Sequence, residues 1–397
     1  MFGLEHIIAP ISTDDFLKSY WGEKALYIPG DADKFQDLFG WDDINHILNH
    51  GRPSFEGVRL VHEKQSLPQE ALQSLPEWLT KGATLIINAV NQIDPVVGHF
   101  ASMLSGDINT HVNINSYASC PAKQGFDTHY DRHDVFIAQL AGTKKWAVLE
   151  PTVKWPLEKQ TFPKGEAPNS DPYIECEMSE GDVLYIPRGH WHYAVAVTPS
   201  IHFTVGPQSR SGIDFLLWLT NQLMNNEEFL RKDFPVACIK ELGGSQSDKD
   251  FHRHVENFRQ HMIESFEDED LKEAILQFCM TSNPLRRTYQ FPDMALLEEE
   301  ITPQTEFEMA SEQKAVVRYD ERSKHAEILI RGHILKLDKI SPCVLASLFD
   351  RKGTMTGAEL VGASGSDDWE PIKHFLLLMY DRGVIQLANS AMIQPNP

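Results

Sequence analysis

The sequence predicts an α+β fold in which a β-barrel comes first and helices follow. Short apolar runs separated by glycine and proline turns fill residues 135–149 and 183–189, a pattern typical of antiparallel strands. After residue 208 the apolar residues follow a helical period instead. Because the chain has 397 residues, which is more than one core usually serves, we expect several domains.

Two histidines and one aspartate in the first half form a candidate metal site. His129 and Asp131 are two residues apart, so on an extended strand their side chains would point to the same face. His192 follows residues 181–189, which read as a turn, a short apolar strand and a tight exit. Two imidazoles and one carboxylate leave three positions of an octahedral ion open. This donor set favours Fe(II), because zinc keeps fewer open positions.

Taken alone, a His-x-Asp pair also fits ordinary polar residues at a strand edge, but its surroundings favour a metal site. Residues 135–140 predict one strand, Gly142 lies in a turn and residues 144–149 predict a second strand. We therefore expect a hairpin built directly onto the metal-binding strand, with His192 at the end of a later strand. Two ligands on a hairpin and a third on a later strand form the layout of a double-stranded β-helix barrel.

These motifs resemble those of the JmjC-type 2-oxoglutarate oxygenases and, within them, the ribosomal oxygenases that hydroxylate ribosomal proteins. The resemblance is carried by the segments 115–117, 129–131, 134–146 and 181–192, and by a helix and strand over residues 16–28. It is strong to about residue 208 and holds in outline beyond. It implies a cupin-like JmjC catalytic domain over 1–208, a helical dimerisation domain over 209–285 and a winged-helix-like domain over 286–397.

The resemblance also implies roles for individual residues. His129, Asp131 and His192 would be the catalytic iron ligands. Lys144 would receive the distal carboxylate of 2-oxoglutarate, because an ammonium is a compact charge with three donors. Lys145 is the alternative, since alternation alone does not decide which lysine faces the interior. The residues expected near the co-substrate, each of which could equally be a satisfied polar residue of the barrel, are Asn115, Tyr117 and Thr204.

Other histidines and acids near the site have simpler interpretations. The three-residue metal site is complete without His133, His190 and His202, so we expect these to be hydrogen-bonded structural imidazoles. His202, on the predicted strand at 201–205, could instead line the pocket. The acids that we expect to stabilise turns and strand ends are Asp134, Glu180 and Asp182.

The function implied by the resemblance is that of a dioxygenase that uses Fe(II), 2-oxoglutarate and O2 and releases succinate and CO2. The expected reaction is hydroxylation of an arginine or histidine side chain of a ribosomal protein, and on an N-methyl group the same chemistry would end in demethylation. One alternative keeps the chemistry but acts on a peptide natural-product precursor or another small substrate. The other alternative is a non-catalytic cupin-like binding module.

The composition limits the partners and the location. A formal net charge of −21 argues against direct nucleic-acid binding and favours a basic protein or peptide. No run of eighteen apolar residues occurs and the first residues lack a signal-peptide pattern, so we expect a cytoplasmic protein without membrane contact. The five cysteines include no Cys-x-x-Cys pair, which argues against zinc or redox work.

The second half predicts helices and then a small mixed domain. Helical apolar patterns occupy residues 213–223, 251–266 and 271–280, and we expect a homodimer through these helices. The apolar residues that could instead pack on their own barrel are Phe215, Leu216, Trp218 and Leu219. The last part predicts strands at 315–319, 326–330 and 384–387 and helices at 342–349, 357–361 and 369–382. Its acidic residues favour a structural or protein-binding role over DNA binding.

Overall fold

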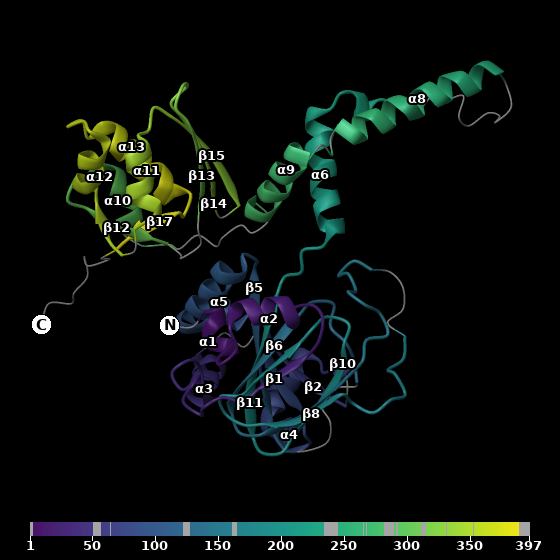
Figure 1. Ribbon diagram of the computed structural model, residues 1–397. Coiled ribbons are helices and arrows are strands. Elements are labelled where there is room, and N and C mark those ends of the chain that lie inside the picture. Colours follow the sequence, from purple (N-terminus) through teal and green to yellow (C-terminus); the bar gives the residue numbers. More distant parts are fainter. Residues whose placement is uncertain are drawn as a thin grey trace, which may run out of the picture. The chain divides into compact units, whose positions relative to one another are not determined.

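The computed structural model divides the chain into two compact units, and the division falls between Ser209 and Arg210 (Figure 1). The described residues are 3–50, 57–63, 65–121, 128–160, 165–233, 245–264, 266, 268–281, 290, 293–310, 315–330, 332–351 and 353–388. Residues 126 and 127, which precede the predicted metal ligands, and residue 286, the predicted start of the third domain, lie outside them.

The first unit contains two antiparallel sheets and several short helices. An eight-stranded sheet has the order β1-β9-β6-β11-β5-β4-β2-β3, and a three-stranded sheet has the order β10-β7-β8. The helical elements are α1 (Leu4–Ile8), α2 (Thr13–Ser19), α3 (Trp41–His50), η1 (Gln69–Ser74), α4 (Leu75–Thr80), η2 (Val90–Gln92) and α5 (Pro95–Ile108). The strands are β1 (Leu26–Ile28), β2 (Val58–His62), β3 (Gln65–Ser66), β4 (Thr84–Ile87), β5 (Val112–Ser119), β6 (Val135–Ala141), β7 (Lys144–Leu149), β8 (Ile174–Met178), β9 (Val183–Ile186), β10 (Trp191–Ala196) and β11 (Ser200–Pro207).

The expected hairpin between the strands at 135–140 and 144–149 is wrong, although both strands are present. β6 pairs with β9 and β11, whereas β7 pairs with β8 and β10 in the other sheet. The connecting turn contains Gly142 at φ +65, where an added Cβ would overlap the carbonyl oxygen of Pro199. This turn therefore carries the chain from one sheet to the other, as a double-stranded β-helix requires.

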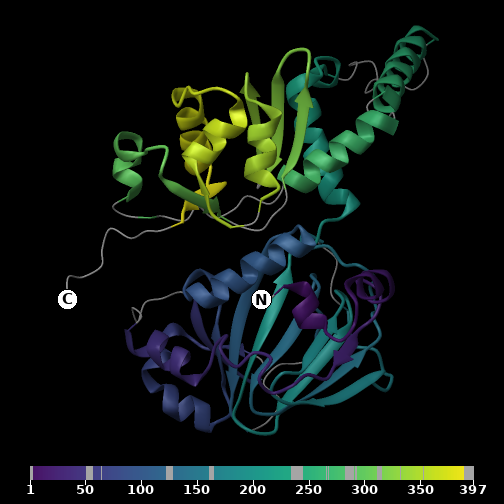
Figure 2. The same cartoon turned by 60° about the vertical axis from the view of Figure 1, so that its left-hand side comes forward.

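Alternation along the strands of the large sheet separates a core face from a pocket face. On β11, Phe203 and Val205 belong to the main apolar core together with residues of α1 and α5. The intervening residues, His202 and Thr204, line a pocket on the opposite face. Figures 1 and 2 show α1, α2 and α5 along one side of the barrel, where they cover this core. The helices thus leave the inner face of the sheet for the site.

The second unit combines helices with two small antiparallel sheets. Its sheets have the orders β16-β12-β17 and β13-β14-β15. The helical elements are α6 (Gly212–Asn226), η3 (Phe229–Arg231), α8 (Ser245–Glu264), α9 (Asp268–Thr281), α10 (Asp293–Glu300), α11 (Pro342–Phe349), α12 (Gly357–Ser364) and α13 (Glu370–Asp381). The strands are β12 (Glu306–Met309), β13 (Val316–Asp320), β14 (His325–Ile330), β15 (His333–Asp338), β16 (Met355–Thr356) and β17 (Ile385–Leu387).

Within the second unit the helical part is attached to the later sheet. Arg318 on β13 forms ion pairs with Glu273 of α9 and, at 3.1 Å, with Glu327 of β14. Both partners are partly shielded from water, so this network links the helix to the sheet more firmly than surface pairs do. The predicted division into a helical module and a winged-helix-like domain stays a prediction.

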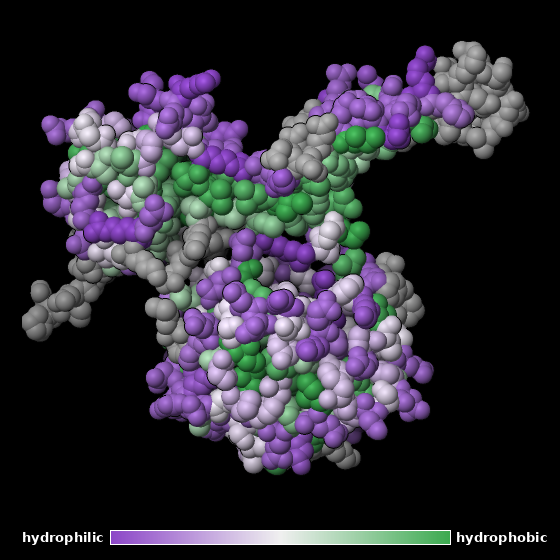
Figure 3. Space-filling view, viewed as in Figure 1, coloured by the Kyte–Doolittle hydropathy of each residue, from purple (hydrophilic) through white to green (hydrophobic). Residues whose placement is uncertain are grey.

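Helix α6 distributes its apolar residues over two faces. Phe215 and Trp218 contact Phe278 of α9, with ring centroids 5.7 and 6.0 Å apart, and Leu219 is buried. Leu216 is 44% exposed. Figure 3 shows further apolar side chains over α6, α8 and α9. Among the helices of the described ranges, none is long and apolar enough to cross a membrane.

Candidate metal centre and pocket

The three predicted metal ligands lie together at one end of the barrel. The His129 amide donates to the His192 carbonyl at 3.1 Å, and the His192 amide donates to the His129 carbonyl at 2.7 Å. One ligand atom from each of His129, Asp131 and His192 lies within 4.8 Å of the others. His192 Nε2 is 3.7 Å from Asp131 Oδ2. The side chains therefore converge on one point, and their donor set fits a metal ion with open coordination positions.

The expected extended strand through His129 and Asp131 is wrong, because within the described residues 128–134 the structure has a single bridge, between His129 and His192. The segment is aligned by the turn before β10 instead: the Gly189 amide donates to the Asp131 carbonyl at 2.9 Å. Gly189 has φ +90, and an added Cβ would overlap the carbonyl oxygen of Val153. The bridge to His192 and the hydrogen bond from Gly189 thus position His129 and Asp131, in place of a regular strand.

The ring of His192 is oriented by its own turn. Its Nδ1 lies 3.1 Å from the His190 carbonyl oxygen. A carbonyl can only accept, so we assign the ring hydrogen to Nδ1, which leaves the Nε2 lone pair directed at the metal position. His192 is 4% exposed, whereas His129 and Asp131 are half-buried. The centre is therefore open on the side of His129 and Asp131.

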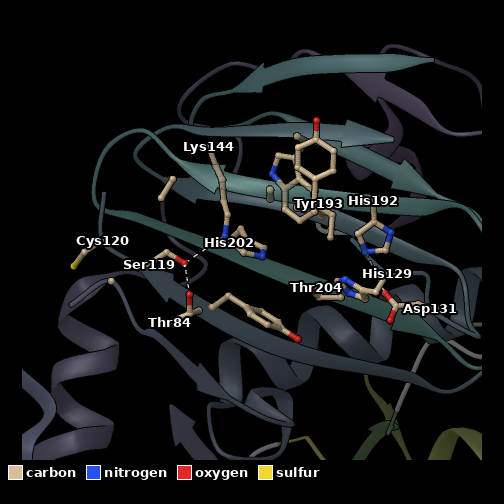
Figure 4. Close-up of a pocket in the computed structure, with 16 residues that line it drawn as sticks. Thr84, Ser119, Cys120, His129, Asp131, Lys144, His192, Tyr193, His202 and Thr204 are labelled. Carbon is tan, nitrogen blue, oxygen red and sulfur yellow. Dashed lines mark hydrogen bonds and ion pairs between the residues drawn. The ribbon is translucent and has the colours of Figure 1, made fainter. Parts of the chain in front are cut away.

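A pocket extends from this centre into the barrel (Figure 4). The three candidate ligands lie at one end, and Lys144, Ser119 and Thr84 lie at the other. The remaining lining residues are Gly82, Tyr117, Cys120, Ile137, Trp146, Tyr193, Ala194, Ala196, His202 and Thr204. The pocket thus places a candidate metal site and a buried cation at opposite ends of one space.

Lys144 and not Lys145 faces the pocket. Lys144 is 6% exposed, and its ammonium donates to Ser119 Oγ at 3.3 Å. Ser119 Oγ lies 3.2 Å from Thr84 Oγ1, so the hydroxyls form a short chain behind the ammonium. Burial lowers the pKa of Lys144 to about 7. Lys145 points outward on β7 and pairs with Glu177 at 3.3 Å.

The three polar residues predicted near the co-substrate have different positions. Tyr117 and Thr204 line the pocket, whereas Asn115 is not among its lining residues in the described chain. The Asn115 amide oxygen accepts a hydrogen bond from the Ala89 amide at 2.9 Å. Burial and the nearby Asp131 carboxylate raise the pKa of Tyr117, and hydrogen bonds with the Thr204 and Asn115 side chains oppose that rise. Asn115 therefore supports Tyr117, and its predicted contact with the co-substrate stays a prediction.

The structural interpretation holds for two of the three additional histidines. His190 Nδ1 is hydrogen-bonded to Tyr173 Oη at 2.6 Å, and His133 Nδ1 lies 3.1 Å from the Asp134 carbonyl oxygen. His202 differs, because it lines the pocket and its Nδ1 has no hydrogen-bond partner among the described residues. The expectation of a hydrogen-bonded structural imidazole is thus wrong for His202.

The three acids assigned to turns and strand ends have that role. The Asp134 carboxylate accepts from Tyr185 Oη at 2.7 Å, and Glu180 accepts from the Gly142 amide at 3.0 Å. Asp182 accepts from Tyr27 Oη and from the Gly30 amide, both at 2.9 Å. These carboxylates have local partners and do not line the pocket of the described residues.

The sequence reasoning missed the hydroxyl groups at the inner end of the pocket. Ser119 is two residues beyond Tyr117 on β5, so strand alternation could have placed it on the same face. The sequence around Thr84 contains no predicted pocket residue from which alternation could place it. It reaches the site only because β4 pairs beside β5, with Thr84 opposite Ser119.

The fold and the donor set define a class of protein. Residues 89–215 match the JmjC domain family, which confirms the predicted resemblance to JmjC proteins. The matched range includes the three candidate ligands, Lys144 and His202. Residues 89–215 thus form a JmjC domain, and the sheets around them give the first unit a cupin-like fold.

Similar curated proteins are ribosomal oxygenases. Ribosomal oxygenase 2 of Bos taurus is 31% identical over 229 residues, which cover 54% of this chain and 49% of that protein. Ribosomal oxygenase 1 of Gallus gallus is 27% identical, with 61% and 43% covered. A Dictyostelium discoideum protein named bifunctional lysine-specific demethylase and histidyl-hydroxylase NO66 is 28% identical, with 62% and 51% covered. The chain therefore spans about half the length of these curated relatives.

A similar solved structure covers nearly the whole chain. It is YcfD, a ribosomal oxygenase from Escherichia coli, in complex with cobalt and 2-oxoglutarate. The TM-score is 0.62 at 16% sequence identity, and the likeness covers 96% of this chain and 99% of that one. At this identity the likeness shows a shared fold, and it extends through both units.

Proposed function

We propose that this chain is an Fe(II)- and 2-oxoglutarate-dependent oxygenase that hydroxylates an amino-acid side chain of a protein. The observation that carries the proposal is the pocket with His129, Asp131 and His192 at one end and the buried Lys144 at the other. The spacing of a cation and a metal site in one pocket suits a ligand with a charged group at each end. The names of the similar proteins and the cobalt and 2-oxoglutarate bound by YcfD support it.

The metal end would hold Fe(II) through two imidazole nitrogens and the Asp131 carboxylate, which leaves positions for a bidentate co-substrate and O2. When bound, iron and 2-oxoglutarate would supply the oxidising chemistry, in which one oxygen atom of O2 enters succinate, CO2 is released and the other oxygen atom enters a substrate C–H bond. The side chains of the protein are not needed as nucleophiles. Their work is to place the co-substrate and to exclude water.

The inner end would bind the distal carboxylate of 2-oxoglutarate. Within the described chain, the Lys144 ammonium donates one hydrogen bond, to Ser119 Oγ. A buried ammonium without a counter-ion is unfavourable, which is why burial lowers its pKa. A carboxylate would supply both the opposite charge and further acceptors, so its binding would offset the cost of burying the ammonium.

We propose a basic protein as the substrate, with an arginine or histidine of a ribosomal protein as the target and the cytoplasm as the location. The net charge of −21 favours association with basic partners through long-range attraction. The names of the relatives support a ribosomal protein as the substrate.

The test is mass spectrometry of ribosomal proteins from cells with and without the gene, with the purified protein and its His129→Ala variant used to repeat the reaction. We expect one ribosomal protein to gain one oxygen atom only with the active protein. Succinate formation without that gain would favour a peptide or small-molecule substrate. Absence of both iron uptake and succinate would support a binding module.

We also propose that the protein forms a homodimer through the helices of the second unit. Exposed apolar residues gather on α6 and α8 (Figure 3), and the clearest are Ile213, Leu216, Leu217, Val255 and Phe258. Sedimentation should show a dimer for the native chain and a monomer for the double variant Leu216→Glu and Leu217→Glu. A native chain that sediments as a monomer at micromolar concentration would contradict this assignment.

A further inference from the structure

His202 occupies a fixed position at the inner end of the pocket, beside Lys144 (Figure 4). It is 3% exposed, and its strand β11 is paired on both sides, with β5 and β6. The ring stacks on Tyr117 with centroids 5.0 Å apart and meets Trp146 edge-on at 5.4 Å. Because two aromatic rings and two neighbouring strands confine it, His202 cannot rotate to find another hydrogen-bond partner.

The ring nitrogens of His202 differ in their surroundings. Nδ1 is enclosed by protein and has no hydrogen-bond partner within the described ranges. Nε2 is not among the enclosed unpaired atoms, so it is the polar atom that the ring presents to the pocket. Leaving a buried N–H unpaired costs more than leaving a lone pair unpaired. We therefore assign the hydrogen to Nε2, where it points to the ligand space.

Charge and composition at this end favour an acceptor as the ligand. Burial and the neighbouring Lys144 hold the pKa of His202 well below its usual value, so the imidazole is neutral and carries one N–H. The polar groups that Lys144 and His202 present to this end of the pocket are therefore an ammonium and a neutral N–H, and both are donors.

We propose that His202 is a second binding residue for the distal carboxylate of the co-substrate, to which Nε2–H donates beside the Lys144 ammonium. The inference rests on the proposed function, since it names a contact of the same co-substrate. A carboxylate has two oxygens with about four acceptor positions, so it can serve both donors. A neutral donor adds a hydrogen bond without a second buried positive charge.

The test is calorimetric titration of the full-length Co(II)-loaded protein with 2-oxoglutarate in the absence of O2. His202→Phe keeps a ring for stacking but removes the N–H, and we expect it to raise the Kd about 10- to 100-fold, the usual loss for a hydrogen bond to a charged group. His202→Gln retains an N–H donor and should recover part of the affinity. Co(II) binding itself should not change. If His202→Phe does not fold, His202→Leu replaces it.

A second ligand separates a direct contact from a structural effect. 2-Oxobutanoate keeps the keto acid but lacks the distal carboxylate, so His202→Phe should alter its Kd less than about twofold, because the lost hydrogen bond is absent in that complex. His62→Leu, on β2 and outside the pocket lining, is the matched control and should bind both ligands as the native protein does.

Three results would overturn the assignment. An unchanged Kd for 2-oxoglutarate in His202→Phe would show that His202 makes no contact. Equal weakening of 2-oxoglutarate and 2-oxobutanoate would show that His202 only maintains the shape of the pocket. Failure of the native Co(II) protein to bind 2-oxoglutarate would reject the proposed function and this inference together, whereas the first two results leave the proposed function intact.

Discussion

The two ends of the pocket are built in different ways. At the metal end, a short segment containing His129 and Asp131 is tied by backbone hydrogen bonds to the turn and first residues of β10. At the inner end, Lys144, Ser119 and His202 come from three different strands and meet only because the sheets are ordered as they are. The metal end thus needs only two segments, which lie far apart in the sequence and are joined by backbone hydrogen bonds, whereas the inner end needs three strands from both sheets.

The two ends of the pocket also differ in how deeply their side chains are buried. Two of the three candidate ligands are half-buried, so metal and substrate can reach them. Lys144 and His202 are buried, and polar groups there have few partners. The metal end therefore suits chemistry on an incoming substrate, whereas the inner end suits selective binding of one small anion.

Removing a ligand at the metal end should have the largest effect. We expect Asp131→Ala to weaken Co(II) binding by at least about 100-fold, more than is lost when a group that merely orients a ligand is changed. The carboxylate supplies the only negative charge of the donor set, which is why its loss should be severe. Equilibrium dialysis with metal analysis measures the Co(II) affinity. If the variant bound Co(II) as tightly as the native protein does, the metal would have to bind at another site.

Removing the cation at the inner end should affect the co-substrate and leave the metal in place. We expect Lys144→Met to raise the Kd for 2-oxoglutarate about 100-fold or more, since a buried carboxylate would lose its counter-ion. Co(II) affinity should stay as in the native protein. Equal losses of metal and co-substrate binding would show that the two ends are not separate.

The pH should act on the inner end through Lys144, whose pKa burial lowers from 10.5 to about 7. Below that value the ammonium is present, and above it the amine must gain a proton before it binds a carboxylate. The Kd for 2-oxoglutarate should therefore rise by up to about tenfold per pH unit above neutrality. Calorimetry at pH 8 in buffers of different ionisation enthalpy should show proton uptake, and Lys144→Met should remove it.

The lowered pKa of Lys144 should also make protein stability depend on pH, in the opposite direction from 2-oxoglutarate binding. Because the folded pKa of Lys144 lies below 10.5, the unfolded chain binds more protons between about pH 7 and 10.5, and Lys144 makes the stability of the ligand-free protein rise with pH in that window. In urea unfolding, the free energy of unfolding of the native protein minus that of Lys144→Met should therefore be more positive at pH 9 than at pH 7. A constant difference would contradict the lowered pKa.

The hydroxyl chain behind the lysine should contribute less. Ser119→Ala removes the hydrogen bond that the ammonium donates, and we expect a 2-oxoglutarate Kd only about 2- to 10-fold higher, because the hydroxyl orients the ammonium without carrying the charge that binds the carboxylate. A larger loss than that of Lys144→Met would mean that Ser119 itself binds the ligand.

The smallest effect should come from the outward neighbour of Lys144. Lys145→Met breaks only an exposed pair with Glu177, so the Kd for 2-oxoglutarate should not change and stability should change by less than about 1 kcal/mol. Calorimetry measures the Kd for 2-oxoglutarate, and urea unfolding measures the stability. Weaker 2-oxoglutarate binding in this variant would return Lys145 to consideration as the co-substrate ligand.

The sequence could predict the metal end because its residues are chemically distinctive and stand in two recognisable segments, 129–131 and 181–192. His129, Asp131 and His192 have the donor types and the flanking turns that a metal site needs, and the resemblance assigned them. The detail that failed was backbone geometry: alternation on a strand explained the His129 and Asp131 pair, but hydrogen bonds to β10 and Gly189 align them.

The inner end could be predicted only in part. Period-two alternation indicates which residues share a face, but it does not say to which sheet a strand belongs, and so β6 and β7 were wrongly expected to pair. Thr84 and His202 enter the site through pairings between strands that are far apart in the chain. Such contacts depend on strand order, which local sequence patterns do not encode.

The central claim is that one pocket joins an iron site to a 2-oxoglutarate site. The most direct test is succinate formation by the purified protein with Fe(II), 2-oxoglutarate and O2, compared with His192→Ala. We expect succinate from the native protein and none above background from the variant. An iron-loaded native protein that binds 2-oxoglutarate but forms no succinate, with or without basic protein substrates, would contradict it.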